Sequence, residues 1–171
     1  LLNESSLLVS NSSSKVFCRM TLQYSRHTWF KVLSKASPKS LEAAWDQTGD
    51  TRPFHQLRAP ETGLGMVRGR ADGTGQAFNL GETTITRCVL KASDSASGGE
   101  IMGIGYVVGR DKRHAELIAR FDAVFQDSAM NDDDRDRILA PLAKERLDLV
   151  STASAKTATT KVDFFTLVRG E

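Results

Sequence analysis

The sequence has little of what most often marks chemistry on its own. Its 171 residues include two cysteines and three histidines, and their formal net charge is only +2. Cys18 and Cys88 have neither metal-site nor disulfide-framework spacing, which favours a reducing compartment, the cytoplasm. So small a net charge argues against a general binder of nucleic acid or of a membrane surface. No apolar run approaches the ~20 residues that a bilayer-spanning helix requires.

Motifs of self-contained enzymes are also missing from the sequence. There is no G-x-x-x-x-G-K-[ST] motif, and Gly63-x-Gly65 fails as a dinucleotide fingerprint because Arg68 stands where the third glycine belongs. No serine or cysteine has the surroundings of a nucleophile motif. The histidines have no metal-ligand spacing, so we expect no metal site; they are His27, His55 and His114. The sequence therefore predicts no independent active site.

The composition is that of an ordinary globular protein, with 40% apolar and 26% charged residues. A chain of this length forms one domain. Residues 1–19 are rich in serine and asparagine without a sustained period, and we expect them to be a disordered extension or an artefact of start-site assignment, with a short targeting segment as the alternative. We therefore place the domain at residues 20–171.

Hydrophobic periodicity predicts helices at both ends of the domain and strands in the middle. Expected helices cover residues 26–35, 38–47 and 111–128, and Ala140-Pro141 indicates the start of a fourth after a charged link at 131–137. Expected strands cover residues 63–71, 83–91 and 101–108, with a hairpin turn at 72–75. The third strand is apolar at nearly every position, which is typical of a central strand covered on both faces. Residues 151–160 are expected to be loosely held.

This order predicts an α+β fold, a single domain with an antiparallel sheet of about three to five strands flanked by helices. The first two helices also fit a DNA-binding helix-turn-helix, but they lack a basic face, so we expect no nucleic-acid partner.

Residues 109–116 form the most informative local feature. Arg110, Lys112 and Arg113 lie in or beside the first turn of an expected helix, whose free amides already favour an anion. A phosphate group or an acidic partner surface would resolve this conflict. The alternative is that Asp111 caps the helix and the cations are solvated. His114 lies on the apolar stripe, which favours a core histidine over a catalytic one.

A second basic set lies on the expected strands. Arg68 and Arg70 share one strand face, and Arg87 lies on the face of Ile85 and Val89, so it points inward or toward an interface. Such an arginine needs an anion, which is either a phosphate or, in the structural alternative, the carboxylate of a neighbouring glutamate; the candidates are Glu61 and Glu82.

The C-terminal tail combines adjacent aromatics with charges. Such a segment is either core or a subunit interface, and its candidate interface residues are Phe164, Phe165, Val168 and Arg169. The candidates for phosphate or triphosphate contact are Arg70, Arg87, Arg110, Lys112 and His114.

Several long segments resemble one family in order and spacing. They include Arg58-Ala59-Pro60-Glu61-Thr62-Gly63-Leu64, the run from Gly105 to Glu116, and Val162-Asp163-Phe164-Phe165-Thr166-Leu167-Val168-Arg169-Gly170. From residue 26 to the C-terminus the chain resembles the G subunit family of the bacterial carbon–phosphorus lyase core complex.

The resemblance implies a cytoplasmic, non-autonomous subunit of a ribose-triphosphate transferase complex in organic phosphonate catabolism. Its implied partners are the H, I and J subunits, with I the most direct, and the ATP-binding L component. With H, I and L, it would be needed for ATP and an alkylphosphonate to form ribose 1-phosphonate 5-triphosphate with release of adenine. Carbon–phosphorus bond cleavage would belong to the radical iron–sulfur J subunit. ATP would be a substrate of the complex, this chain would bind no cofactor, and catalytic residues would lie on a partner. A purely architectural scaffold for the I subunit is the alternative.

Overall fold

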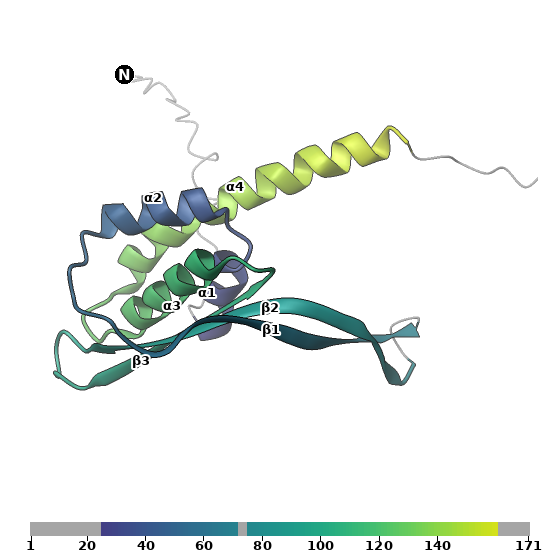
Figure 1. Ribbon diagram of the computed structural model, residues 1–171. Coiled ribbons are helices and arrows are strands. Elements are labelled where there is room, and N and C mark those ends of the chain that lie inside the picture. The colour runs from purple at the N-terminus through teal and green to yellow at the C-terminus, as the bar shows by residue number, and fades with distance from the viewer. Residues whose placement is uncertain (1–24, 72–74, 161–171) are drawn as a thin grey trace, which may run out of the picture.

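A computed structural model describes residues 25–71 and 75–160 of the chain (Figure 1). The expectation for residues 1–19 lies outside them and stays a prediction. The described elements are α1 (Arg26–Leu33), α2 (Pro38–Thr48), β1 (His55–Arg70), β2 (Ala77–Ser93), β3 (Glu100–Val108), α3 (Lys112–Gln126) and α4 (Asp132–Ala158). The α+β single domain is therefore confirmed, with three strands.

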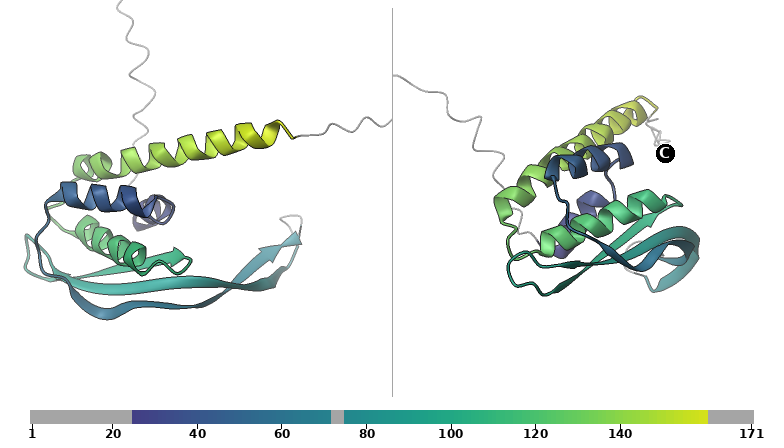
Figure 2. Two further views of the ribbon diagram at one scale, coloured as in Figure 1. Left: turned by 45° about the horizontal axis from the view of Figure 1, so that its top comes forward. Right: turned by 60° about the vertical axis from the view of Figure 1, so that its left-hand side comes forward.

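The strands form one antiparallel sheet in the order β1-β2-β3. All four helices lie on the same face of this sheet (Figure 2). Helix α3 packs directly on the sheet, α1 and α2 cover α3, and α4 lies outermost across α1 and α2. No described element covers the opposite face of the sheet, here called the open face.

The expectation that the third strand is central was wrong. β3 is an edge strand, and β2 is the central one. The apolar run of β3 arises because its inward positions are small or aliphatic while its outward positions, such as Met102 and Val108, are also apolar but exposed. An unbroken apolar run therefore did not mean burial on both faces here.

Two glycines let α3 approach β3 very closely. A Cβ added at Gly103 would lie 2.0 Å from the carbonyl oxygen of Ala119, and one at Gly105 would lie 1.9 Å from that of Ala115. The facing helix positions are alanines spaced four residues apart, so neither element has a side chain that would hold the backbones apart. Helix and strand thus pack backbone against backbone.

Aromatic side chains fill the space between α3 and the outer helices. The rings of Trp45 and Phe121 meet edge to face with centroids 5.2 Å apart, and Trp29 meets Phe125 in the same way at 5.6 Å. The fully or nearly fully buried residues of this core include Leu33, Leu41, Leu117, Ile118, Leu139 and Leu142.

The carboxylate of Asp122 joins three elements inside this core. It is fully buried and accepts hydrogen bonds from Arg26 Nη2 (2.6 Å), Trp29 Nε1 (3.0 Å) and the backbone N–H of Ile104 (2.8 Å). A buried charge is tolerated only when it is paired and hydrogen-bonded in this way. Asp122 therefore ties α1 and the edge of β3 to α3.

Helix α4 corrects three expectations. Residues 131–137 are not a link, because Asn131 caps the helix by accepting a hydrogen bond from Asp134 N (2.8 Å) and acidic residues occupy its first turn, where the helix dipole favours them. Pro141 lies inside the helix and does not begin it. Residues 151–158 are also helical, and the hydroxyls of Thr152 and Thr157 bond back to carbonyls one turn earlier.

Two parts of the fold extend beyond the helical body. β3 pairs with β2 only from Ile85 onward, so residues 64–70 of β1 and 77–84 of β2 form a two-stranded ribbon, here called the arm. Residues 143–158 of α4, here called the distal half of α4, project from the same end of the body (Figure 1). Both carry large apolar side chains that are mostly exposed: Leu64, Met66, Val67, Phe78 and Leu80 on the arm, and Leu147, Leu149 and Val150 on the helix.

Two aspartates join the loops at the opposite end of the sheet. Asp94 accepts hydrogen bonds from the N–H of Ser97 (2.9 Å), the hydroxyl of Ser128 (2.7 Å) and the N–H of Ala96, and these lower its pKa. Burial opposes ionisation of Asp127, but hydrogen bonds from its neighbours outweigh this and lower its pKa; they include Ser95, Ala129 and Arg52.

We expect Gly105→Ala to destabilise the protein because the added methyl group would collide with the α3 backbone. Overpacking of this kind costs about 1–3 kcal/mol, and the free energy of unfolding in urea would measure it. Gly63→Ala is the matched control, because a Cβ there meets nothing within 4 Å. Equal stability of the two variants would contradict the close packing.

We also expect the protein to lose stability as the pH falls below about 4. Asp94 and Asp127 have folded-state pKa values below the unfolded value of about 3.9. Their contribution is therefore present above that pH and is lost as the pH falls through the folded-state pKa. Thermal melts between about pH 2 and 5 should show a shallower decline for Asp94→Asn than for the exposed control Asp46→Asn. Parallel curves would refute this role for Asp94.

Candidate binding and interface residues

The turn between β3 and α3 is held in place by backbone and side-chain hydrogen bonds. The N–H of Gly109 donates to the carbonyl of Thr84 (2.9 Å), and the hydroxyl of Thr86 donates to the carbonyl of Gly109 (2.7 Å). Gly109 has a φ of 117°, which glycine adopts readily. Asp111 then caps α3 by accepting a hydrogen bond from His114 N (2.9 Å), which confirms the expected cap.

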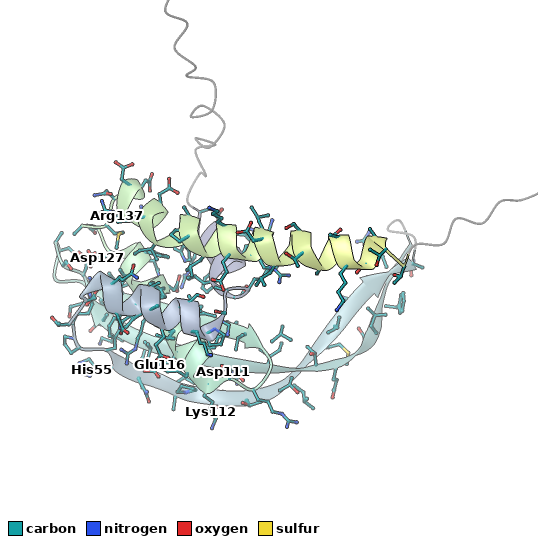
Figure 3. The ribbon with its side chains drawn as sticks, turned by 90° about the horizontal axis from the view of Figure 1, so that it is seen from above. His55, Asp111, Lys112, Glu116, Asp127 and Arg137 are labelled. Carbon is teal, nitrogen blue, oxygen red and sulfur yellow. The ribbon has the colours of Figure 1, made fainter. Side chains whose placement is uncertain are left out.

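Arg110 and Lys112 are exposed at this turn, and among the described residues neither forms an ion pair. Figure 3 shows Lys112 beside Asp111 at the start of α3. Arg113 differs, since its guanidinium pairs with Glu42 (3.0 Å) and Glu116 (3.2 Å). The turn thus offers two cations, Arg110 and Lys112, to an external anion.

His114 is separated from these cations. Its side chain is buried, and its Nε2 lies 3.2 Å from the carbonyl oxygen of Leu33 inside the core. This confirms the core-histidine alternative. Nothing in its placement supports contact with a phosphate.

Arg87 lies on the open face of the sheet and forms an ion pair with Glu61. Its Nε is 2.6 Å from Glu61 Oε1, and Arg58 Nη1 reaches the same oxygen at 2.6 Å. The hydrogen bonds from Arg58 and then Arg87 lower the pKa of Glu61. The structural alternative of a glutamate partner is therefore confirmed with Glu61. Of the two expected orientations for Arg87, the inward one was wrong, and the interface-facing one stays a prediction. Two guanidinium groups share one carboxylate, so the cluster keeps an excess of positive charge.

Arg70 is not brought to either of these places. It pairs in register with Ala77 near the tip of the arm, whereas Arg87 is opposite Glu61. Nine residues of β1 separate the two positions, which is roughly 30 Å along an extended strand. The candidates for phosphate contact that are not buried therefore lie in three separate places: Arg70 on the arm, Arg87 on the open face of the sheet, and Arg110 with Lys112 at the turn before α3. The tail candidates Phe164, Phe165, Val168 and Arg169 lie outside the described residues.

Sequence reasoning missed a stacked arginine between α2, α3 and β1. The guanidinium of Arg120 lies 5.6 Å from the ring centroid of Trp45 and 5.3 Å from that of Phe54, and its Nη2 pairs with Glu116 (2.7 Å). The only local signal was the four-residue spacing of Glu116 and Arg120. Nearby, burial raises the pKa of the Cys88 thiol to about 11, so it stays protonated at neutral pH.

A groove of about 920 Å³ lies between α2 and the first half of α4. Its cations are engaged: Arg52 pairs with Asp50 and Asp127, and Arg137 with Asp134 (3.1 Å). Figure 3 shows Asp127 and Arg137 well apart from Lys112, which begins α3 while Asp127 follows its last residue. A triphosphate would meet these carboxylates, so the groove is a poor polyanion site.

The described ranges hold neither a cluster of metal ligands nor a membrane-spanning helix. Within residues 25–71 and 75–160, no three or more His, Cys, Asp or Glu side chains are grouped so as to hold a metal ion. In the same ranges, no helix combines the length and the apolarity needed to cross a bilayer.

Comparison with known proteins places these features in a family. The model of the phosphonate metabolism protein PhnG matches residues 24–170. The chain is 42% identical over 147 residues to the alpha-D-ribose 1-methylphosphonate 5-triphosphate synthase subunit PhnG of Rhizobium meliloti (strain 1021), and the match covers 85% of this chain and 90% of that protein. With the family match spanning nearly all of the described fold, the chain belongs to the PhnG family of phosphonate metabolism proteins.

Proposed function

We propose that this chain is a non-autonomous, cytoplasmic subunit of a hetero-oligomeric synthase that makes ribose 1-phosphonate 5-triphosphate. The observation that carries the proposal is the 42% identity to a protein named as a subunit of alpha-D-ribose 1-methylphosphonate 5-triphosphate synthase, across 90% of its length. Its partners in this proposal are the H, I and J subunits, with I in most direct contact, and the ATP-binding L component.

The proposed reaction replaces one bond at the ribose of ATP. The bond from C1′ to adenine breaks, a phosphonate oxygen bonds to C1′, and the 5′-triphosphate is kept. Both reactants are anions, so the assembled site must supply cationic or N–H donors along the triphosphate. We assign the bond-breaking residues to a partner subunit, and this chain binds ATP only as a substrate of the complex.

Arg110 and Lys112 are the best candidates on this chain for contact with the triphosphate. They are exposed, they have no acidic partner among the described residues, and they flank the amide-rich start of α3. Arg87 is a weaker candidate because Glu61 already accepts from it, and an incoming phosphate would have to displace or share that carboxylate. Arg70 already lies near the tip of the arm, so it would contact substrate only if a partner subunit held the substrate there.

A purely architectural role is the second candidate function. It is favoured by the ion pairs that already engage the guanidinium groups of Arg58, Arg87 and Arg113. In that case the basic residues stabilise contacts between subunits, and substrate touches only the partners.

The direct test is adenine release from ATP and methylphosphonate by the reconstituted subunits. Mixtures of H, I and L with this chain should release adenine, and the same mixture without it should fall to the uncatalysed rate. Equal rates with and without the chain would contradict the proposal.

The alanine variants Arg110→Ala and Lys112→Ala separate the two roles. If these side chains contact the triphosphate, each variant should assemble normally and raise the KM for ATP roughly tenfold or more, as expected for loss of a charge-assisted hydrogen bond. Lys39→Ala, an exposed lysine at the start of α2, is the matched control. Loss of assembly with unchanged kinetics in the residual complex would instead establish the architectural role.

A further inference from the structure

We infer that the arm and the distal half of α4 together hold an apolar segment of a partner subunit, flanked by acidic side chains. This inference rests on the proposed function, because it takes the partner to be another subunit of the synthase. The family match does not say where this chain contacts other subunits; the inference names the contact surface and the kind of side chains that it binds.

The arm continues the core face of the sheet beyond the helices. The hydroxyls of Thr62 and Thr86 meet at 3.1 Å on the face that α3 covers, and Thr86 is fully buried. The register runs without a shift from Thr62 to Met66, so Leu64 and Met66 share that face. They are nevertheless 70% and 52% exposed. The sheet thus presents a core-type surface over which none of the four described helices lies.

The distal half of α4 repeats this pattern. Leu139 and Leu142 are buried where α4 crosses the body, and the same stripe continues through Leu149 and Val150 at helical spacing. These two side chains are 55% and 45% exposed. Figures 1 and 3 show that the distal half of α4 and the arm project from the same end of the body. Two uncovered core faces at one end indicate one shared occupant.

An isolated two-stranded ribbon is at best marginally stable in water. The arm nevertheless extends seven or eight residues per strand past the end of β3, and both of its faces carry exposed apolar side chains. Leu64 and Met66 lie on the core face. Phe78 and Leu80 lie on the other, because Phe78 is opposite Gly69 and a Cβ at Gly69 would meet Leu80. Monomeric proteins rarely expose an apolar surface of this kind without a binding role. Burying it against a partner would stabilise both the ribbon and the assembly.

The charges of these two parts select the partner's chemistry. The arm, counted over residues 64–70 and 77–84, has two arginines and one glutamate, and the distal half of α4 has three basic and two acidic residues. No described acidic side chain pairs with Arg68 or Arg70. Both parts are therefore net positive, which disfavours the same surface of a second copy and favours a segment with carboxylates at its flank.

The test is retention of this chain by tagged partner subunits when all are co-expressed. We expect the double variant Leu64→Gln/Met66→Gln, and separately Leu149→Gln/Val150→Gln, to reduce the retained amount at least about tenfold, because buried apolar anchors dominate binding. Leu57→Gln/Met102→Gln is the matched control, since it removes one leucine and one methionine of similar exposure outside the proposed surface.

The acidic flank is tested by charge reversal. Arg68→Glu/Arg70→Glu should weaken retention at least about tenfold at low salt. Lys35→Glu/Lys39→Glu, with the same change in charge in the link after α1 and at the start of α2, should not. Thermal melts of every variant check folding, which substitutions of exposed side chains should leave within a few degrees.

The outcomes separate this inference from the proposed function. If the unmodified chain is not retained, the subunit function itself fails. Two outcomes overturn the inference alone. In the first, the arm and helix variants are retained as well as the unmodified chain. In the second, the control variant Leu57→Gln/Met102→Gln loses retention to the same extent as they do. Hydrogen exchange identifies the occupant: arm amides should gain protection only in the assembled complex. Equal protection in the free monomer would contradict the proposal. Protection that appears only with self-association would also contradict it, because it would assign the surface to a second copy.

Discussion

The close approach of α3 to β3 is the constraint on which the rest of the structure depends. Gly103 and Gly105 allow the strand backbone to meet the helix backbone, and Asp122 fixes the two elements together with α1. Once α3 lies there, it covers only the part of the sheet where three strands are paired. The start of α3, with Arg110 and Lys112, is then placed next to Thr84 and the base of the arm.

Much of this fold follows from the sequence by local rules. The spacing of Trp45 in α2 and of Phe121 in α3 predicted helices whose apolar stripes do form the core. The position of β3 in the sheet was not predictable in this way. The alternation of apolar and polar residues along a strand indicates which faces are apolar, but it does not indicate which strands pair with one another. Pro141 was also misleading. Proline is favoured at the first turn of a helix, yet here it lies inside α4, where it has no N–H to donate to the carbonyl four residues earlier.

The candidate site was predictable only in part. Residue type and spacing offered, as alternatives, a helix cap by Asp111 and an ion pair of Arg87 with Glu61 or Glu82; the structure confirms the cap and selects Glu61. The separation of Arg70 from the other cations did not, because it depends on how far β1 extends past β3. Stacking of Arg120 on two aromatic rings also required tertiary packing. The family resemblance identified the biochemical setting, while the exposed arm emerged only from the three-dimensional arrangement.

The two uncovered core faces and the unpaired cations have a common explanation if this chain completes its structure and its chemistry with other subunits. The most direct test is the native mass of the chain after co-expression with the proposed H, I and J partners. The account predicts a single stable assembly whose mass includes all four kinds of subunit. A well-folded monomer of this chain that elutes apart from the others would contradict it.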